Sequence, residues 1–179
     1  MFLLGSAYPT AKLALNASIP PILFGSLRML IVFICLLPFL RFKLPDKKYL
    51  FPLFGFAISM GTGVNLFLYL SVSKSNILSP IVIGAQLSIP FGLILSLLFL
   101  KENISIKRWF LISLSFIGIL IIAYDPRIIN DKFGLALVIV MAFFYAVSNL
   151  MARVLKEVDT ATLNGWHGLI AFIPIAVLT

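Results

Sequence analysis

The chain has 179 residues, of which 61% are hydrophobic and 11% are charged. Soluble domains are about 45–50% apolar and about 25% charged, so the composition excludes an ordinary soluble globular protein. The mean hydropathy of +1.13 predicts that lipid surrounds most of the surface. The net charge of +8 is a topology signal in such a protein, and it does not indicate a nucleic-acid partner.

Apolar segments of membrane-spanning length follow one another along the chain, separated by short polar or turn-forming stretches. They cover residues 2–17, 20–40, 49–72, 76–100, 107–124, 133–155 and 160–179. We therefore predict an all-α integral membrane protein with about seven transmembrane helices, because a helix satisfies its backbone hydrogen bonds without water. Nine lysines and arginines fall on the side of the 41–48 loop and four on the other side, which predicts that this loop is cytoplasmic.

The first predicted helix contains Pro9 next to Tyr8. Proline removes the hydrogen bond to the carbonyl of Gly5, so the helix should kink beside Tyr8. A broken helix often marks a transport site, and an ordinary membrane proline is the alternative. The helix lacks an anchor before it, and the last apolar run ends without a polar terminator. We therefore expect the chain to be part of a longer protein, or a split or frameshifted version of one.

Arg28 is the charge that lies deepest in a predicted helix. It follows Pro20 by eight residues, which places it about 12 Å into the second span. An arginine at this depth is costly and normally has a partner, yet no acidic residue is predicted there. Arg28 is therefore either a structural anchor or a contact for an anionic group of a substrate.

Small and polar side chains form a stripe on the predicted third helix. At about 100° per residue they fall within an arc of about 120°. The stripe consists of Gly55, Ser59, Thr62, Asn65, Tyr69 and Ser73. In lipid this face must turn inward, either to line a water-filled path or to pack against other helices. Asn65 and Tyr69 are the candidates for a path.

Two further helices carry candidate polar residues. In the fourth, Gln86 lies mid-span, away from a ridge of small residues that predicts tight helix packing. The ridge is Pro80, Gly84, Ser88, Gly92 and Ser96. Gln86 is either a path residue or an interhelical hydrogen-bonding group. In the sixth, Tyr145 and Asn149 belong to a one-faced series, and we expect them to converge with Tyr8, Asn65 and Tyr69 on one space near mid-membrane.

Residues for catalysis are scarce. The sequence has one histidine, His167, and one cysteine, Cys35, and its acidic residues all fall in loops or at helix ends. No nucleophile with a base and no metal-ligand set can be assembled, so we predict no enzyme, no metal and no cofactor. We expect His167 to be a hydrogen-bonded packing residue.

Several short motifs occur in a characteristic order. The first part of the chain reads Gly5-Ser6-Ala7-Tyr8-Pro9-Thr10-Ala11-Lys12-Leu13-Ala14, then Ile19-Pro20-Pro21 and Leu27-Arg28. Later come Leu68-Tyr69, Ser79-Pro80, Leu100-Lys101-Glu102-Asn103-Ile104-Ser105 and Gly118. This series resembles the EamA domain of the drug/metabolite transporter superfamily, with residues 1–124 as one five-helix repeat.

The resemblance implies that residues 133–179 begin a second repeat of inverted orientation. It implies a carrier of a small organic metabolite, such as an amino acid, a nucleotide-related compound or a drug-like molecule, in the inner membrane of a bacterial cell. The partners would be the lipid bilayer, the substrate, and either a second copy or C-terminal helices that this chain lacks. The alternative is a non-transporting membrane fragment or an assembly subunit derived from such a carrier.

Overall fold

A computed structural model describes residues 12–13, 20–39, 46–74, 79–101, 105–124 and 132–177. Within these ranges the regular structure is helical throughout, which confirms the predicted all-α class. The longer uninterrupted helices are α2 (Pro21–Leu36), α7 (Ile106–Ala123), α9 (Lys132–Val154) and α10 (Thr160–Val177). Their bounds agree with the predicted segments to within a few residues. Pro21 occupies the first turn of α2, where its missing N–H leaves no hydrogen bond unmade.

Two of the spans contain a change of helix type. The third consists of α3 (Lys47–Phe56), the π-helix η2 (Ala57–Val64) and α4 (Asn65–Lys74). The fourth consists of α5 (Ser79–Gly84), the 3-10 turn η3 (Ala85–Leu87) and α6 (Ser88–Leu100). A π-helix turns by less than 100° per residue, so the predicted stripe on the third helix does not continue unchanged through η2.

Three helices are long and apolar enough to cross a membrane by length and composition. They are Lys47–Lys74, Ile81–Leu100 and Phe133–Val154. Large apolar side chains lie exposed on most helices, most clearly along α7. An exposed surface of this kind is suited to lipid rather than to water.

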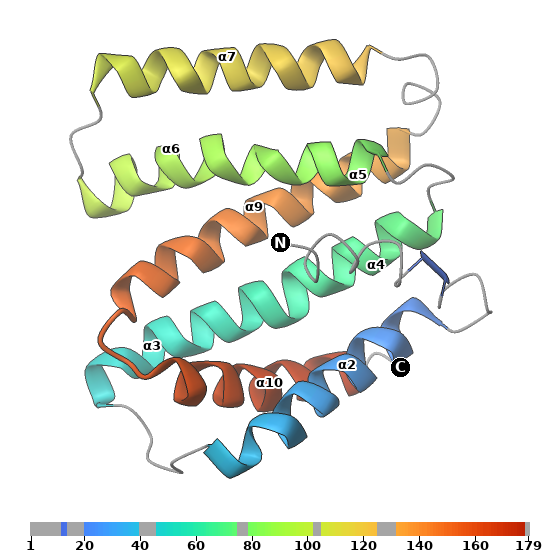
Figure 1. Ribbon diagram of the computed structural model, residues 1–179, viewed down its shortest axis with the longest axis vertical. Coiled ribbons are helices and arrows are strands. Elements are labelled where there is room, and N and C mark those ends of the chain that lie inside the picture. The colour runs from blue at the N-terminus through green and yellow to red at the C-terminus, as the bar shows by residue number, and fades with distance from the viewer. Residues whose placement is uncertain are drawn as a thin grey trace.

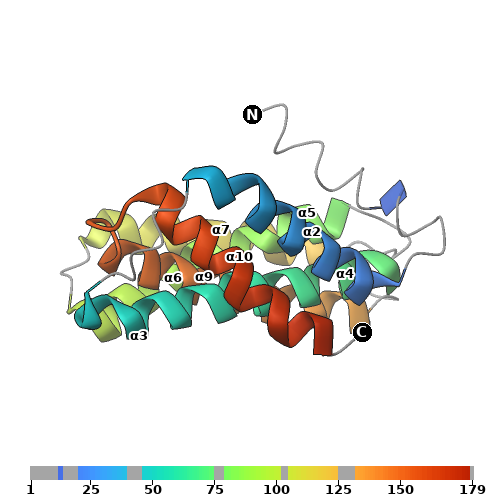
Figure 2. The same ribbon diagram turned by 90° about the horizontal axis from the view of Figure 1, so that it is seen from below.

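The helices lie side by side in a flattened arrangement (Figure 1). α9 lies between α6 and the α3–α4 run, and α10 lies between that run and α2 (Figures 1 and 2). The two helices nearest the C-terminus therefore insert among helices from the first part of the chain. They are not a separate unit.

Small residues allow these helices to approach closely. A side chain at Gly84 would collide with Val138 of α9, while one at Gly63 would come within 2.6 Å of the Phe144 ring. On the predicted small-residue ridge, Ser88 and Ser96 are also buried. A Cβ at Gly92, by contrast, would meet nothing within 4 Å. The ridge contacts α9 at Gly84 and at Ser96, whose hydroxyl accepts from Arg153, and it is open at Gly92.

Candidate functional site

Arg28 of α2 reaches across to α4 and holds two of the predicted path residues. Its Nη1 donates hydrogen bonds to Asn65 Oδ1 at 2.8 Å and to the Tyr69 hydroxyl at 2.9 Å. Asn65 is 4% exposed and Tyr69 is 3% exposed, whereas Arg28 itself is exposed. A charged group therefore lies at the edge of a buried polar pair, and it is fixed there by neutral partners.

Asn65 also stabilises the end of the π-helix. Its backbone N–H bonds to the carbonyl of Thr62. Its side-chain Nδ2 donates to the carbonyls of Met60 and Gly61, both at 2.9 Å. One amide thus satisfies carbonyls of the wide turn and accepts from Arg28. Because π-helices occur frequently at functional sites, this junction is a candidate for one.

The Tyr69 ring is held by neighbours on α2. It packs edge-on against Phe24 with ring centroids 5.1 Å apart. A Cβ at Gly25 would lie 3.2 Å from the ring, so glycine at this position makes room for the tyrosine. α2 therefore supplies the packing surface for the ring as well as the cation for its hydroxyl group.

His167 of α10 lies beside the π-helix η2, next to Gly61. It is 7% exposed, its ring centroid is 5.4 Å from that of Phe56, and a Cβ at Gly61, whose carbonyl accepts from Asn65, would lie 3.1 Å from its Nε2. The ring is packed as predicted, but neither ring nitrogen has a hydrogen-bond partner within the described ranges, so the predicted hydrogen bond is wrong. A buried polar atom without a partner costs about 1–3 kcal/mol. This makes His167 a candidate for a ligand contact.

Sequence reasoning missed His167 as a member of the site. The signal that could have revealed His167 was its position within its helix, which matches that of Arg28. Arg28 is the eighth residue of α2, which begins at Pro21, and His167 is the eighth residue of α10, which begins at Thr160. Two corresponding helices of an internal repeat would place these residues at equivalent positions.

The remaining candidates do not join the Arg28 cluster. Tyr145 is 38% exposed and Asn149 is exposed, so the expectation that they turn inward with Asn65 and Tyr69 is wrong in this structure. The reason is that α9 is packed between α6 and α4, and these two neighbours cover other sides of the helix.

Gln86 is exposed as well, in the turn η3, and this part of the fourth span lies beyond α9 from the α2–α10 pair (Figure 1). The structure therefore does not place Gln86 with the Arg28 cluster. Tyr8 and the predicted kink at Pro9 lie outside the described residues.

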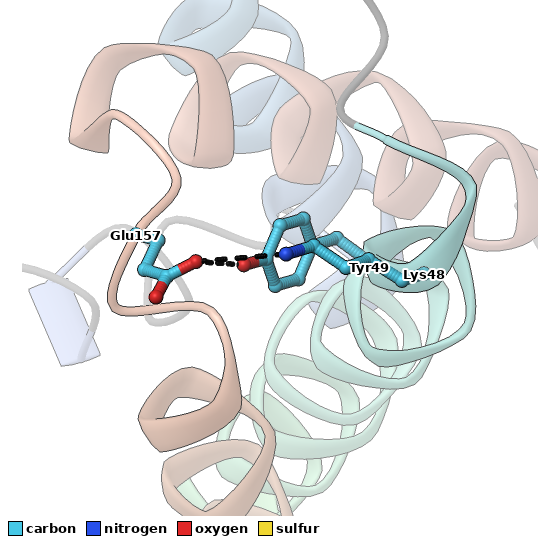
Figure 3. A network of polar contacts seen from close by, with 3 residues as sticks. All are labelled: Lys48, Tyr49 and Glu157. Carbon is cyan, nitrogen blue, oxygen red and sulfur yellow. Dashed lines mark hydrogen bonds and ion pairs between the residues drawn. The ribbon is translucent and has the colours of Figure 1, made fainter.

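A second polar cluster lies at the start of α3, beside the turn between α9 and α10 (Figure 3). The Tyr49 hydroxyl donates a hydrogen bond to the Glu157 carboxylate. Lys48 Nζ lies 3.8 Å from that carboxylate and 4.5 Å from the centre of the Tyr49 ring. The Tyr49 hydroxyl, followed by the charge of Lys48, holds the pKa of Glu157 below its ordinary value. Both charged side chains are largely exposed.

The charged side chains of the described helices are all basic. None of these helices contains an aspartate or a glutamate. Among the described residues, no three histidine, cysteine or acidic side chains are placed to hold a metal ion. The distinctive chemistry is one guanidinium with amide, phenol and imidazole groups near it. Three apolar helices long enough to cross a membrane, one of which carries Asn65 and Tyr69 of this cluster, define a polytopic membrane protein.

The comparison with known families agrees with this class. The profile of the EamA-like transporter family matches residues 1–124, which is well over half of the chain. The chain belongs to the EamA-like transporter family, and it is therefore an integral membrane protein of a transporter family rather than of an enzyme family. No curated protein and no solved structure matches it.

Proposed function

We propose that the chain takes part in carrying a small organic metabolite across a bacterial inner membrane, and that Arg28, Asn65 and Tyr69 contact the solute. The observation that carries the proposal is the fixed but exposed guanidinium at Arg28. It makes hydrogen bonds of 2.8 and 2.9 Å to buried neutral groups. A membrane-embedded charge of this kind is a functional-site hypothesis by default.

The depth of the cluster supports this proposal. Arg28 lies eight residues from Pro20 at one end of α2, and Asn65 lies nine residues from Lys74 at the end of α4. At about 1.5 Å per residue, both are about 12–14 Å from these helix ends. This is close to the middle of a hydrocarbon layer about 30 Å thick. Carriers built from repeats commonly bind their solutes at this depth.

We assign residues 1–124 to a first repeat and 133–179 to the start of a second. In this assignment the exposed polar side of α9, with Tyr145 and Asn149, faces further helices, which come either from the C-terminal continuation or from a second copy. Exposed polar side chains on a membrane helix need such a cover. Gln86 and Tyr8 remain proposed path residues.

Solute counterflow in liposomes tests the function. The full chain is reconstituted in liposomes preloaded with unlabelled solute, and uptake of labelled phenylalanine, uridine and ethidium is measured. We expect uptake of at least one solute above that of empty liposomes. The Asn65→Leu variant should reduce it, whereas Ser115→Ala, an exposed position on α7, should not. Absence of uptake by the unchanged chain would instead favour the non-transporting assembly subunit.

A further inference from the structure

The α2 and α10 helices share a sequence pattern. Leu30-Ile31-Val32-Phe33-Ile34 in α2 matches Leu169-Ile170-Ala171-Phe172-Ile173 in α10 at four of five positions. The same offset along the chain aligns Arg28 with His167. The two helices therefore carry their polar residue at the same place, two positions before the shared apolar pattern.

The contacts between the two helices are consistent with a two-fold relation. Gly25 lies near Ile175, and Gly168 lies against the backbone of Met29 and Phe33. Residue numbers that rise along α2 therefore meet numbers that fall along α10, so the helices run antiparallel. Met29 and Gly168, which the same offset aligns and which directly precede the shared pattern, meet at the centre of this contact. Arg28 and His167 then lie at equivalent distances on either side of the centre, as the corresponding residues of an inverted repeat would.

We propose that Arg28 and His167 together form a binding site for a carboxylate group of the solute, with one residue contributed by each repeat. This inference rests on the proposed function and adds the chemical class of the solute to it. Arg28 is the open side of the site, because it is exposed, and His167 is the buried side.

The donors at Arg28 fit a carboxylate. Its two hydrogen bonds to described residues both use Nη1. Nε and Nη2 have no acceptor within the described part of the chain, and the described helices contain no acidic residue. A guanidinium presents such donors as a planar fork, which pairs with the two oxygens of a carboxylate. The substrate would thus supply the negative charge that this part of the protein lacks.

His167 adds a further donor from the second repeat. A neutral imidazole carries one N–H whichever tautomer is present, and neither ring nitrogen of His167 is bonded within the described residues. Since Arg28 is the only cation of α2 and α10, a singly charged carboxylate fits this pair better than a phosphate dianion.

Binding of simple carboxylates by the purified full chain tests the proposal. Labelled benzoate is measured by equilibrium dialysis in detergent, with benzamide as the neutral analogue of the same shape and inorganic phosphate as the competing anion. We expect saturable benzoate binding that unlabelled benzoate displaces and that benzamide and phosphate do not. Displacement by benzamide, or stronger displacement by phosphate, would overturn the assignment.

Variants locate the site. Arg28→Gln should weaken benzoate binding about tenfold or more, since a charge-assisted pair is lost. Arg28→Lys keeps the charge without the fork and should weaken it less. His167→Gln should weaken it about threefold to tenfold, as expected for one hydrogen bond. Lys107→Gln, an exposed cation on α7, should leave it unchanged. If Arg28→Gln does not fold, the Arg28→Lys and His167→Gln variants test the site instead. Benzoate binding that is unchanged in both would overturn the proposal.

The two proposals can fail separately. If carboxylates do not bind while uridine or ethidium is still taken up in an Asn65-dependent way, the transport function holds and the carboxylate site is wrong. If benzoate binds through Arg28 but no solute is carried, the site stands and the transport function falls.

Discussion

Among the described residues, two charged side chains are hydrogen-bonded to a tyrosine, and their surroundings differ. Arg28 donates to the Tyr69 hydroxyl and to Asn65, both of which are buried. Glu157 accepts from the Tyr49 hydroxyl at an exposed helix end, where Lys48 also lies 3.8 Å away. The first charge has only neutral partners within the described chain, while the second has a neutralising charge beside it.

This difference shows which contact is available for function. At the exposed end, water and Lys48 compensate the carboxylate, so the contact chiefly positions the turn between α9 and α10 against α3. Inside the helices, hydrogen bonds orient the guanidinium without cancelling its charge. A charge that is oriented but not neutralised can still bind an anion. Single changes should therefore matter most at the buried partners of Arg28 and least at the exposed Glu157 contact.

The largest effect should follow a change at Gly61, which lies where η2 meets α10. A Cβ at this position would overlap the Cβ of Ala171 and come within 3.1 Å of His167 Nε2. Gly61→Ala should therefore lower the free energy of unfolding by about 1–3 kcal/mol, because the helices must separate. Denaturation of the full chain in detergent, followed by circular dichroism, measures this loss.

Two comparisons make the Gly61 result specific. Gly92→Ala, at a position where a Cβ meets nothing within 4 Å, should not destabilise the protein. The double variant Gly61→Ala with Ala171→Gly removes the overlapping methyl group and should recover most of the loss. Equal losses at Gly61 and Gly92, or no recovery in the double variant, would show that this close contact does not limit the packing of α10.

Replacement of Asn65 by leucine should have the next largest effect. Asn65→Leu keeps a similar volume but removes the acceptor for Arg28 and the donor for the Met60 and Gly61 carbonyls. Leaving these groups unpaired should cost about 1–3 kcal/mol in the free energy of unfolding. Ser96→Ala, which removes a single acceptor for Arg153, is the control and should cost less. Equal costs would contradict a special role for the π-helix junction.

A smaller effect is expected at Tyr69. Tyr69→Phe keeps the edge-on contact with Phe24 and removes only the hydroxyl group that accepts from Arg28. The expected loss is about 0.5–1.5 kcal/mol by the same denaturation measurement. Tyr124→Phe, at an exposed position after α7, should change nothing. A Tyr69→Phe variant as stable as Tyr124→Phe would mean that Asn65 alone orients the guanidinium.

Much of the fold can be predicted from the sequence, because membrane-spanning helices are recognised by their length and their apolar composition. The segments 107–124 and 133–155 correspond to α7 and α9 almost residue for residue. Burial of Asn65 and Tyr69 was also predictable, because polar side chains avoid lipid. Their hydrogen-bond partner, Arg28, could not be predicted in this way. Arg28 lies 37 and 41 residues away along the chain, and only the packing of α2 on α4 brings it there.

Other features depended on tertiary context. The π-helix η2 interrupts the regular spacing that the stripe assumed, and nothing in periodicity alone signals the change. The direction of Tyr145 depends on which sides of α9 are covered by α6 and α4, and a one-sided pattern does not contain that information. The equivalence of His167 and Arg28 could have been predicted by aligning the two Leu-Ile-x-Phe-Ile patterns.

The smallest expected effect is a shift in the pKa of Glu157, in the exposed cluster at the start of α3. The Tyr49 hydroxyl bonds to the charged form of Glu157, which lowers the pKa of that carboxyl below the ordinary value of 4.5. The contact is therefore complete above this value and is lost as the pH falls through the lowered pKa. Tyr49→Phe should raise the Glu157 pKa towards 4.5, and Lys48→Met should raise it by less, because Tyr49 is the larger cause.

The sequence makes this titration simple to observe. Glu102 and Glu157 are its two glutamates, so selective ¹³C labelling of glutamate gives two carboxyl resonances, and Glu102→Gln assigns them. The Glu157 midpoint should lie below 4.5 in the unchanged chain and move upwards in Tyr49→Phe. Arg28→Lys, at the buried site, should leave it in place. If the Glu157 midpoint is the same in Tyr49→Phe as in the unchanged chain, this contact does not hold the turn between α9 and α10 against α3. A Glu157 midpoint that shifts in Arg28→Lys would mean that the charges of Arg28 and Glu157 are coupled, which the contrast between the two tyrosine contacts does not allow.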